Sequence, residues 1–400
     1  MTSAQPSMEE LLKTLPSNAT MRDIFDFCVK HKLHNLAQGM IELNPPAKLR
    51  DISARVCVEG NDVHQYRNRF GEEDYRNSIV ELLSKKFGCN VPKEAVLATA
   101  GVSGGIVSTL MLLKSEAAKS NRLPKIAILV PFYTYHNKQI QDILGVTPVY
   151  IPTNEDFTPN WDAITKELQN GLDLIMFTNP GNPQGNLWTK EDLDRMVELT
   201  KAHNCMLLLD EIYCDLVWKG KFYSPIHEKL HDHVVVCRGF SKTLGCQSWR
   251  VGYVVASPST AEKLMRIHDP LYISVPFLQH GIAEYIKTDY EDFLNHVQQV
   301  SDLMQSNWRL LSRTMQKTLG WEPLEPSGSM YGLFKHGQKS DRDAVLQGLY
   351  NGVGVAPGNI FWNGTPDNTT YVRIHVGISA EKAQQIADTL EKNYQERQKK

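Results

Sequence analysis

A carboxylate and a phenol follow an apolar run in the middle of the chain. The segment DEIYCDLVWKGK begins with Asp210 directly after CMLLL, and Tyr213 follows three residues later. A carboxylate at the end of a buried strand is costly unless it is paired. Asp210 could keep a heterocyclic nitrogen protonated, while Tyr213 donates a hydrogen bond to an adjacent phenolate oxygen. The alternative is that Asp210 only caps the next turn.

A lysine and an arginine stand eight residues apart in the segment GFSKTLGCQSWRVGY. Lys242 follows the apolar run HVVVC, and a lysine amine in a partly desolvated, cationic pocket loses its proton readily and can form an imine. Arg250 offers a planar fork that suits a phosphate. A solvated lysine and an ion-paired arginine are the alternative for these two side chains.

Three more strand ends carry residue types that suit a flat, phosphorylated ligand. The turn TAGVSGG places Ser103 and Gly104 where backbone N–H groups at a helix N-terminus could hold a phosphate. Tyr133 in PFYTYH could stack on a ring, and Asn182 in NPGNPQG could hold a ring oxygen. Taken singly, a common glycine turn and aromatic packing explain the first two motifs. A turn explains one Asn-Pro pair of the third motif, but a second pair in the same loop is harder to explain in that way.

These residues need elements that bring strand ends together. Continuous apolar runs, read as strands, alternate with helical segments such as 72–88, 103–115 and 189–203. The predicted strands are 95–100, 125–130, 147–152, 172–179, 205–210, 233–240 and 250–257. This alternation predicts an α/β fold with a mostly parallel sheet covered on both faces, in which ligands gather at the carboxyl ends of the strands.

The two ends of the chain have a different texture. Ser7 and Glu10 predict a capping box for a short helix, and residues 36–46 read as an extended arm. After about residue 285 the pattern is that of a smaller α+β domain. Its predicted elements are a long helix at about 288–318, strand 330–337, helix 340–352, strand 370–377 and a closing helix from Ser379.

We therefore expect three parts along the chain. Residues 1–48 would form an N-terminal helix and arm that packs with the small domain, 49–285 the large domain, and 286–400 the small C-terminal domain.

Composition excludes several classes of function. Lys and Arg number 43 against 45 Asp and Glu, so no basic surface for nucleic acid or an acidic membrane is expected. The seven cysteines are scattered and form no CxxC pair, which argues against a disulfide framework and a zinc site and favours a cytoplasmic location. No apolar run is long enough for a signal or membrane segment, and we expect no metal and no membrane partner.

In their order along the chain, the motifs TAGVSGG, PFYTY, NPGNPQG, DEIY and SKTLGCQSWRVGY resemble the class I and II aminotransferases. These are fold-type I enzymes that use pyridoxal 5'-phosphate (PLP). The resemblance extends from about Gly39 to the segment YVRIHVG. It implies a mostly parallel seven-stranded sheet in the large domain and a homodimer whose active sites are shared between subunits.

The resemblance implies a role for each matching residue around the ring of the cofactor. Lys242 corresponds to the lysine that forms the imine with PLP, and Asp210 to the partner of the pyridine nitrogen. Tyr213 and Asn182 correspond to the partners of the ring O3′, and Tyr133 to the aromatic residue that stacks on the ring.

The phosphate and the substrate have matching residues as well. Ser103, Gly104, Ser241 and Arg250 correspond to the phosphate ligands, and Tyr66 to a tyrosine that reaches the phosphate from the other subunit. Arg373 corresponds to the arginine that binds the substrate α-carboxylate, and Gly39 and Asn182 correspond to residues of the same substrate pocket.

One position departs from the family pattern. Family members commonly carry a serine three residues before the lysine, whereas this chain has Gly239. One hydroxyl contact to the phosphate is therefore missing, and either water or another group replaces it or the cofactor binds somewhat more weakly.

The implied activity is transfer of an amino group from an L-amino acid to a 2-oxo acid by a ping-pong mechanism. The alternative on the same fold is a PLP-dependent elimination or cyclisation, because the fate of the substrate carbanion depends on pocket groups that the motifs do not reveal. A transcription regulator is disfavoured, since the residues before Gly39 are too few and not basic enough for a DNA-binding module.

Overall fold

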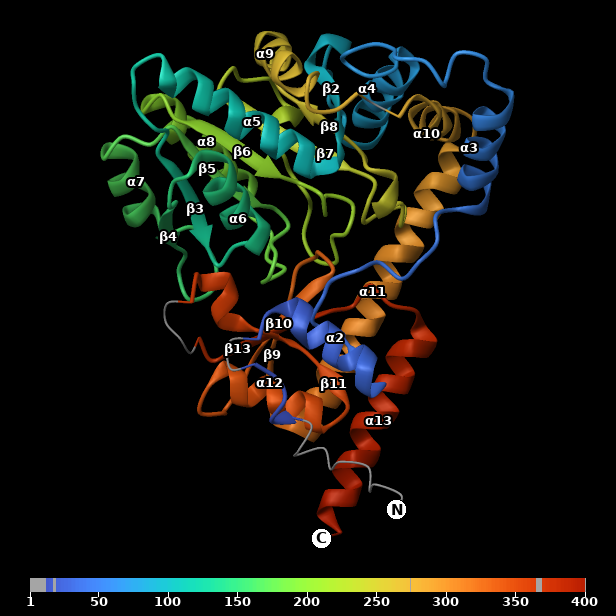
Figure 1. The fold of residues 1–400 in the computed structure, drawn as a ribbon, viewed down its shortest axis with the longest axis vertical. Helices are drawn as coiled ribbons and strands as arrows, with labels where there is room; N and C mark the ends of the chain where they lie inside the picture. The colour runs from blue at the N-terminus through green and yellow to red at the C-terminus, as the bar shows by residue number, and fades with distance from the viewer. Residues whose placement is uncertain (1–11, 17–18, 274, 365–368, 400) are drawn as a thin grey trace. The chain divides into compact units, whose positions relative to one another are not determined.

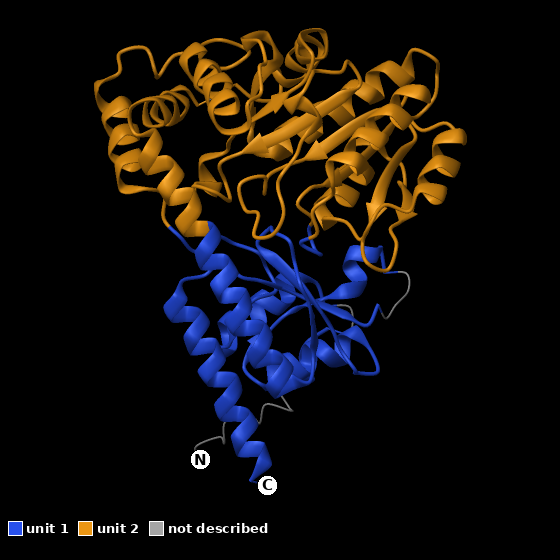
Figure 2. Ribbon diagram, turned by 180° about the vertical axis from the view of Figure 1, so that it is seen from behind, with its two compact units in different colours: residues 1–43, 182–185, 301–400 blue, residues 44–181, 186–300 orange. Residues whose placement is uncertain are grey.

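The computed structural model describes residues 12–16, 19–273, 275–364 and 369–399. The expected capping box of Ser7 and Glu10 lies outside these residues. The chain forms two compact units (Figure 2): unit 1 comprises residues 1–43, 182–185 and 301–400, and unit 2 comprises residues 44–181 and 186–300. The three-part division that we expected from the sequence remains a prediction.

Unit 2 is built on a seven-stranded sheet in the order β2-β8-β7-β6-β5-β3-β4 (Figure 1). Its strands are β2 (Val96–Ala100), β3 (Ile126–Val130), β4 (Val149–Pro152), β5 (Leu174–Thr178), β6 (Met206–Asp210), β7 (Val234–Gly239) and β8 (Val251–Val255). Neighbouring strands run parallel except β8, which is antiparallel to both β2 and β7. The predicted α/β fold with a mostly parallel sheet is confirmed.

The helices of unit 2 begin and end largely where capping signals place them. Thr189 caps α8 and exchanges hydrogen bonds with Asp192, and α4 ends at Gly88, whose φ of 67° favours glycine. The helices are α3 (Ala47–Glu59), α4 (Glu73–Phe87), α5 (Gly101–Ala118), α6 (Thr134–Leu144), α7 (Trp161–Gln169), α8 (Lys190–Ala202), α9 (Pro258–His268) and α10 (Pro276–Thr288). Helix α11 (Tyr290–Leu319) continues from unit 2 into unit 1.

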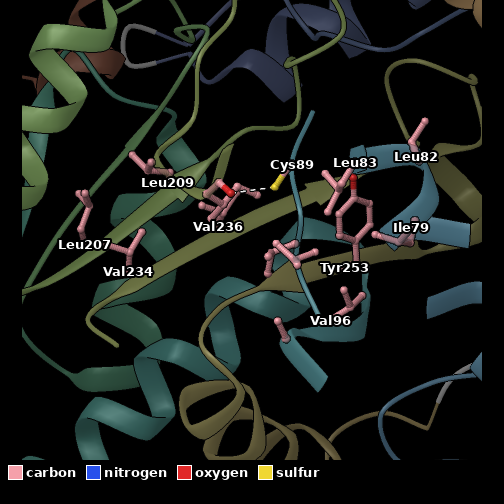
Figure 3. Close-up of a cluster of buried hydrophobic side chains, with 14 of the residues drawn as sticks. Ile79, Leu82, Leu83, Cys89, Val96, Leu207, Leu209, Val234, Val236 and Tyr253 are labelled. Carbon is pink, nitrogen blue, oxygen red and sulfur yellow. Dashed lines mark hydrogen bonds between the residues drawn. The ribbon is translucent and has the colours of Figure 1, made fainter. Parts of the chain in front are cut away.

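The two faces of the sheet are buried by different helices, because side chains alternate along each strand. Ile79 and Leu83 of α4 belong to one apolar cluster with Val236 of β7 and Tyr253 of β8 (Figure 3). The intervening residues of β7 and β8 face α5, since a Cβ built on Gly105 would stand 2.6 Å from Val254 Cγ2. Helix α5 can lie this close to the sheet only because residue 105 is glycine.

Unit 1 contains a smaller sheet in the order β12-β13-β10-β9 and a separate parallel pair, β1 with β11. Its strands are β1 (His34–Asn35), β9 (Glu322–Leu324), β10 (Tyr331–Lys335), β11 (Val353–Gly354), β12 (Ala356–Pro357) and β13 (Tyr371–His375). The helices are α2 (Met21–His31), α12 (Asp341–Tyr350) and α13 (Ala380–Gln398). The predicted closing helix begins as expected, with Ser379 as its N-cap.

All seven cysteines lie in the described part of the chain, and none forms a disulfide. Six are buried, while Cys57 of α3 is half-buried. Burial raises the pKa of Cys28 and Cys205 to about 12. Among the described residues, no helix has the length and apolar character needed to cross a membrane.

Candidate active site

Asp210 ends strand β6 with its carboxylate buried, since the residue is 3% exposed. Its Oδ1 accepts a hydrogen bond from the backbone N–H of Ile212 at 3.2 Å, so Asp210 does cap the next turn. Its Oδ2 accepts from His136 Nε2 at 3.1 Å. A carboxylate oxygen can only accept, so Nε2 carries the proton in this contact. The turn role and a role in chemistry are therefore compatible.

His136 is a residue whose importance could not be read from the sequence. It lies in the first turn of α6 and is 1% exposed. Its ring meets that of Tyr133 edge-on, with 5.3 Å between the ring centroids. The sequence offered one signal, a histidine three residues after a candidate stacking aromatic at the end of a strand. Without the fold, core packing explained that histidine as well.

The N-terminus of α5 and a guanidinium form a cradle for an anion. Gly101 begins the helix, and Ser103 is exposed in its first turn beside half-buried Gly104. Arg250 Nη2 donates to the carbonyl of Ala100 at 3.1 Å, and a Cβ built on Gly101 would stand 2.9 Å from the same nitrogen. Unpaired N–H groups of a helix terminus together with an exposed arginine suit a phosphate.

Three glycines bring this cradle close to the sheet. Gly239 of β7 is paired with Gly252 of β8, and a Cβ on Gly252 would stand 2.7 Å from Gly101 Cα. A Cβ on Gly239 would stand 3.2 Å from Gly252 Cα. A serine at position 239 would therefore press on a backbone that already rests against the start of α5.

Lys242 lies in a single turn directly after β7. The turn is closed by a hydrogen bond from the N–H of Leu244 to the carbonyl of Phe240 at 2.9 Å. Ser241 is buried and Lys242 is half-buried. Because β6 and β7 run parallel, with Asp210 opposite Cys237, the segments that carry Asp210 and Lys242 leave the sheet at the same edge.

Tyr213 lies in the segment that follows β6, three residues after Asp210. It is 3% exposed, and its carbonyl accepts a hydrogen bond from the N–H of Leu216 at 2.8 Å, which closes a turn. Tyr66 is different: it lies in the loop between α3 and α4 and is 87% exposed in the single chain.

A second group of candidate residues meets within unit 1. Arg373 of β13 is 1% exposed, and its guanidinium donates to Asn182 Oδ1 at 2.9 Å and to the carbonyl of Ala37 at 2.7 Å. It also lies over the rings of Tyr331 and Phe361, with 4.1 Å and 4.6 Å from its Cζ to the ring centroids. Neither aromatic ring was identified from the sequence.

Gly39 belongs to the same group. A Cβ built on it would stand 2.0 Å from Tyr331 Oη, so no side chain fits at this position unless Tyr331 moves. The two residues are far apart in the sequence, which is why glycine at 39 has no explanation from its neighbours in the chain.

Comparison with known proteins places the chain in one family. The family model described as aminotransferase class I and II matches residues 31–390. An aspartate aminotransferase of Sulfurisphaera tokodaii is 27% identical over 344 residues, which cover 82% of each chain. An aromatic-amino-acid aminotransferase of Thermococcus litoralis is 24% identical over 396 residues, covering 92% of this chain and 95% of the relative.

Solved structures share the fold. YbdL of Escherichia coli, described as having a methionine aminotransferase function, superposes with a TM-score of 0.84 at 18% identity and covers 97% of this chain and 100% of its own. An aspartate aminotransferase of Thermus thermophilus with maleate superposes with a TM-score of 0.82 at 18% identity, covering 97% and 100%. With a family model that matches nearly the whole length, the chain belongs to the class I and II aminotransferases, and its function is that of an aminotransferase.

Proposed function

We propose that this chain is a PLP-dependent aminotransferase that moves an amino group from an L-amino acid to a 2-oxo acid by a ping-pong mechanism. The amino acid leaves as its 2-oxo acid, and the acceptor oxo acid leaves as an amino acid. The observation that carries the proposal is the buried carboxylate of Asp210, which ends β6 and is held by His136 Nε2 at 3.1 Å.

The described residues fit the cofactor that the family uses. The cradle of Arg250 and the start of α5 suits the phosphate, with Ser103, Gly104 and Ser241 as further ligands. Asn182 Nδ2 is buried and has no hydrogen-bond partner among the described residues, as a donor intended for a ligand oxygen would be. When bound, PLP supplies an electron-withdrawing ring that stabilises negative charge at the substrate Cα.

Asp210, Tyr213 and Tyr133 would orient the ring. An ionised Asp210 favours the protonated pyridine nitrogen, because an opposite charge in a buried site stabilises a cation. Tyr213 would donate to the ring oxygen together with Asn182, and Tyr133 would stack on the ring face.

Lys242 would move the proton. Its amine would hold the cofactor before substrate arrives and, once free, would take the proton from the substrate Cα as a general base. The turn after β7 supports this role because it places Lys242 at the sheet edge where β6 also ends.

Arg373 would bind the substrate α-carboxylate, since a planar guanidinium can donate two parallel hydrogen bonds to a carboxylate. Gly39 and Asn182, which lie beside it in unit 1, would line the same pocket. The relatives are described variously as acting on aspartate, aromatic amino acids or methionine, so their names suggest no single side chain for the substrate of this chain.

We further propose a cytoplasmic homodimer in which each subunit lends Tyr66 to the phosphate of its partner. The 87% exposure of Tyr66 in the single chain supports the dimer. The seven free cysteines support the cytoplasmic location, because the cytosol keeps thiols reduced.

The test begins with the purified protein, which should be yellow and should lose its visible band on borohydride reduction. Lys242→Ala should not retain a covalently attached cofactor after reduction. A single amino acid without an oxo acid should convert the bound cofactor once and then stop. Continuous turnover of one amino acid with no acceptor would instead favour elimination or cyclisation, and a protein that cannot be reconstituted with PLP would refute the proposal.

A further inference from the structure

The segments after β6 and β7 are joined by a side-chain hydrogen bond. Thr243 Oγ1 donates to Asp215 Oδ2 at 3.1 Å. Asp215 lies two residues after Tyr213, and Thr243 directly follows Lys242. The bond therefore connects the segment of two candidate catalytic residues, Asp210 and Tyr213, to the turn of a third.

The Asp215 carboxylate is itself fixed from the other side. Lys86 in the last turn of α4 donates to Asp215 Oδ1, and the two side chains are only 19% and 10% exposed. Burial alone would raise the pKa of Asp215, but the charge and hydrogen bond of Lys86, together with the charge of Arg238 and the hydrogen bond from Thr243, outweigh burial, so the net pKa is lowered. The carboxylate thus stays ionised, and a charged acceptor makes the bond from Thr243 stronger than one between neutral groups.

A second buried link connects the same two segments. Arg238, near the end of β7, forms an ion pair with Glu211, which directly follows Asp210, at 2.8 Å between Nη2 and Oε2. Both side chains are fully buried. The backbone before Lys242 is therefore held to the backbone after Asp210, and Thr243, on the other side of Lys242, is held to Asp215.

We propose that Asp215 and Thr243 are positioning residues for Lys242. The carboxylate, which is held by Lys86, accepts a hydrogen bond from the Thr243 hydroxyl. This bond fixes the turn that contains Lys242 at the edge of the sheet. The two residues touch no substrate in this scheme, because they act through the backbone of the turn. This inference rests on the proposed function, in which Lys242 is the reactive amine.

Two substitutions of Thr243 distinguish the contribution of its hydroxyl from that of its methyl group. Thr243→Val keeps the shape of the buried side chain and removes only the donor, while Asp215 retains Lys86 as its partner. Thr243→Ser keeps the donor and removes the methyl group. Thr200→Val is the matched control, because Thr200 is equally buried and its hydroxyl donates only within α8, to the carbonyls of Met196 and Val197.

The first measurement needs no cofactor. Hydrogen exchange of the cofactor-free protein should show roughly tenfold faster exchange of the Leu244 amide in Thr243→Val, because that amide closes the turn. Exchange in Thr243→Ser and in Thr200→Val should stay within about threefold of the parent protein. Faster exchange in Thr243→Ser than in Thr243→Val would show that packing of the methyl group, and not the hydrogen bond, holds the turn, and would overturn the inference.

The second measurement is the rate at which PLP becomes attached to Lys242, followed by the visible band after mixing with cofactor-free protein. The rate should fall roughly tenfold in Thr243→Val, recover in Thr243→Ser and stay unchanged in Thr200→Val. An unchanged rate in Thr243→Val would overturn the inference even if exchange at Leu244 responds. If the parent protein itself binds no PLP, the proposed function fails. This outcome is distinct from failure of the inference, which is judged by comparing the variants with the parent protein.

Discussion

His136 Nε2 and Asp210 Oδ2 lie 3.1 Å apart, and both side chains are almost fully buried. The pair joins the first turn of α6 to the last residue of β6 and leaves the Asp210 carboxylate one fixed orientation. His136 is thus a positioning residue for the carboxylate, which it orients through the hydrogen bond from its Nε2.

His136→Phe should remove this donor while keeping a ring of similar size. A buried carboxylate that loses a partner is destabilised by about 1–3 kcal/mol, so we expect a lower free energy of unfolding and a kcat/KM reduced roughly tenfold. His136→Gln should recover part of the activity, because its amide can still donate. Tyr135→Phe, at a neighbouring exposed position, is the control. Equal kinetics for the phenylalanine variant and the parent protein would contradict the role.

Asp210→Asn should reduce kcat/KM by at least about 100-fold, with little change in fold, because the amide keeps the shape of the side chain but not its charge. Kinetics and the thermal melting of the variant test this together. Activity near that of the parent protein would mean that the charge at the end of β6 plays no part in the reaction.

Gly39→Ala should crowd the ring of Tyr331, whose Oη lies 2.0 Å from the position of the new methyl group. Overpacking of this kind costs about 1–3 kcal/mol, and displacement of Tyr331 should also raise KM for the amino acid. Gly337→Ala serves as the control, because nothing lies within 4 Å of a Cβ built there. Melting temperature and KM are the measurements, and identical behaviour of the two variants would refute the clash.

Gly239→Ser would restore the serine that many family members carry. The new Cβ would stand 3.2 Å from Gly252 Cα, and Gly252 has little room to yield because it rests on Gly101. We expect a loss of stability of about 1 kcal/mol and no tighter binding of PLP. Gly239→Ala should behave alike, since the volume and not the hydroxyl causes the loss. Tighter binding in the serine variant alone, measured by titration of the cofactor-free protein, would contradict this.

His280 provides a prediction of pH dependence. Its Nδ1 contacts Asp74 Oδ2 at 2.6 Å and its Nε2 lies 3.3 Å from Glu72 Oε2; the hydrogen bond to Asp74 and the two negative charges raise the pKa of His280 despite burial and nearby Arg67. The stabilisation is therefore fully present below the unfolded pKa of about 6.5 and is lost as pH rises through the higher folded value.

The difference in stability between the parent protein and His280→Gln should follow this course. We expect the variant to be less stable by up to about 1 kcal/mol at pH 6, because the site is partly exposed, and the gap to shrink by pH 9. Denaturant unfolding at both pH values provides the comparison. A gap of constant size would show that the charge of His280 is not the cause.

Much of the fold could be predicted because its signals are local. The strands of unit 2 are continuous apolar runs, and their observed ends lie within one or two residues of those expected. Helix α4 stops at Gly88 as predicted. Helix α3 was not identified, since it follows Pro46 without a side-chain cap and its apolar residues are few. Helix α2 was also missed, although Thr20 and Asp23 form the capping box that begins it.

The candidate site was less accessible to sequence reasoning. The motifs named the residues that follow each strand, but their partners come from distant parts of the chain. Asn182 and Arg373 are 191 positions apart, and His136 and Asp210 are 74 apart. No spacing rule connects such pairs, because the sheet order and the packing of α6 decide which side chains meet. The roles of these residues with cofactor and substrate remain predictions.

The distribution of the cysteines provides one natural site for chemical labelling, Cys57. Six thiols are buried, so a maleimide dye applied under native conditions should react first at Cys57. The carbonyl of Cys57 lies 3.0 Å from His64 Nε2, two residues before Tyr66, so the dye would report on the loop that we expect to meet a second subunit. Mixing donor- and acceptor-labelled protein would then reveal subunit exchange without any engineered residue.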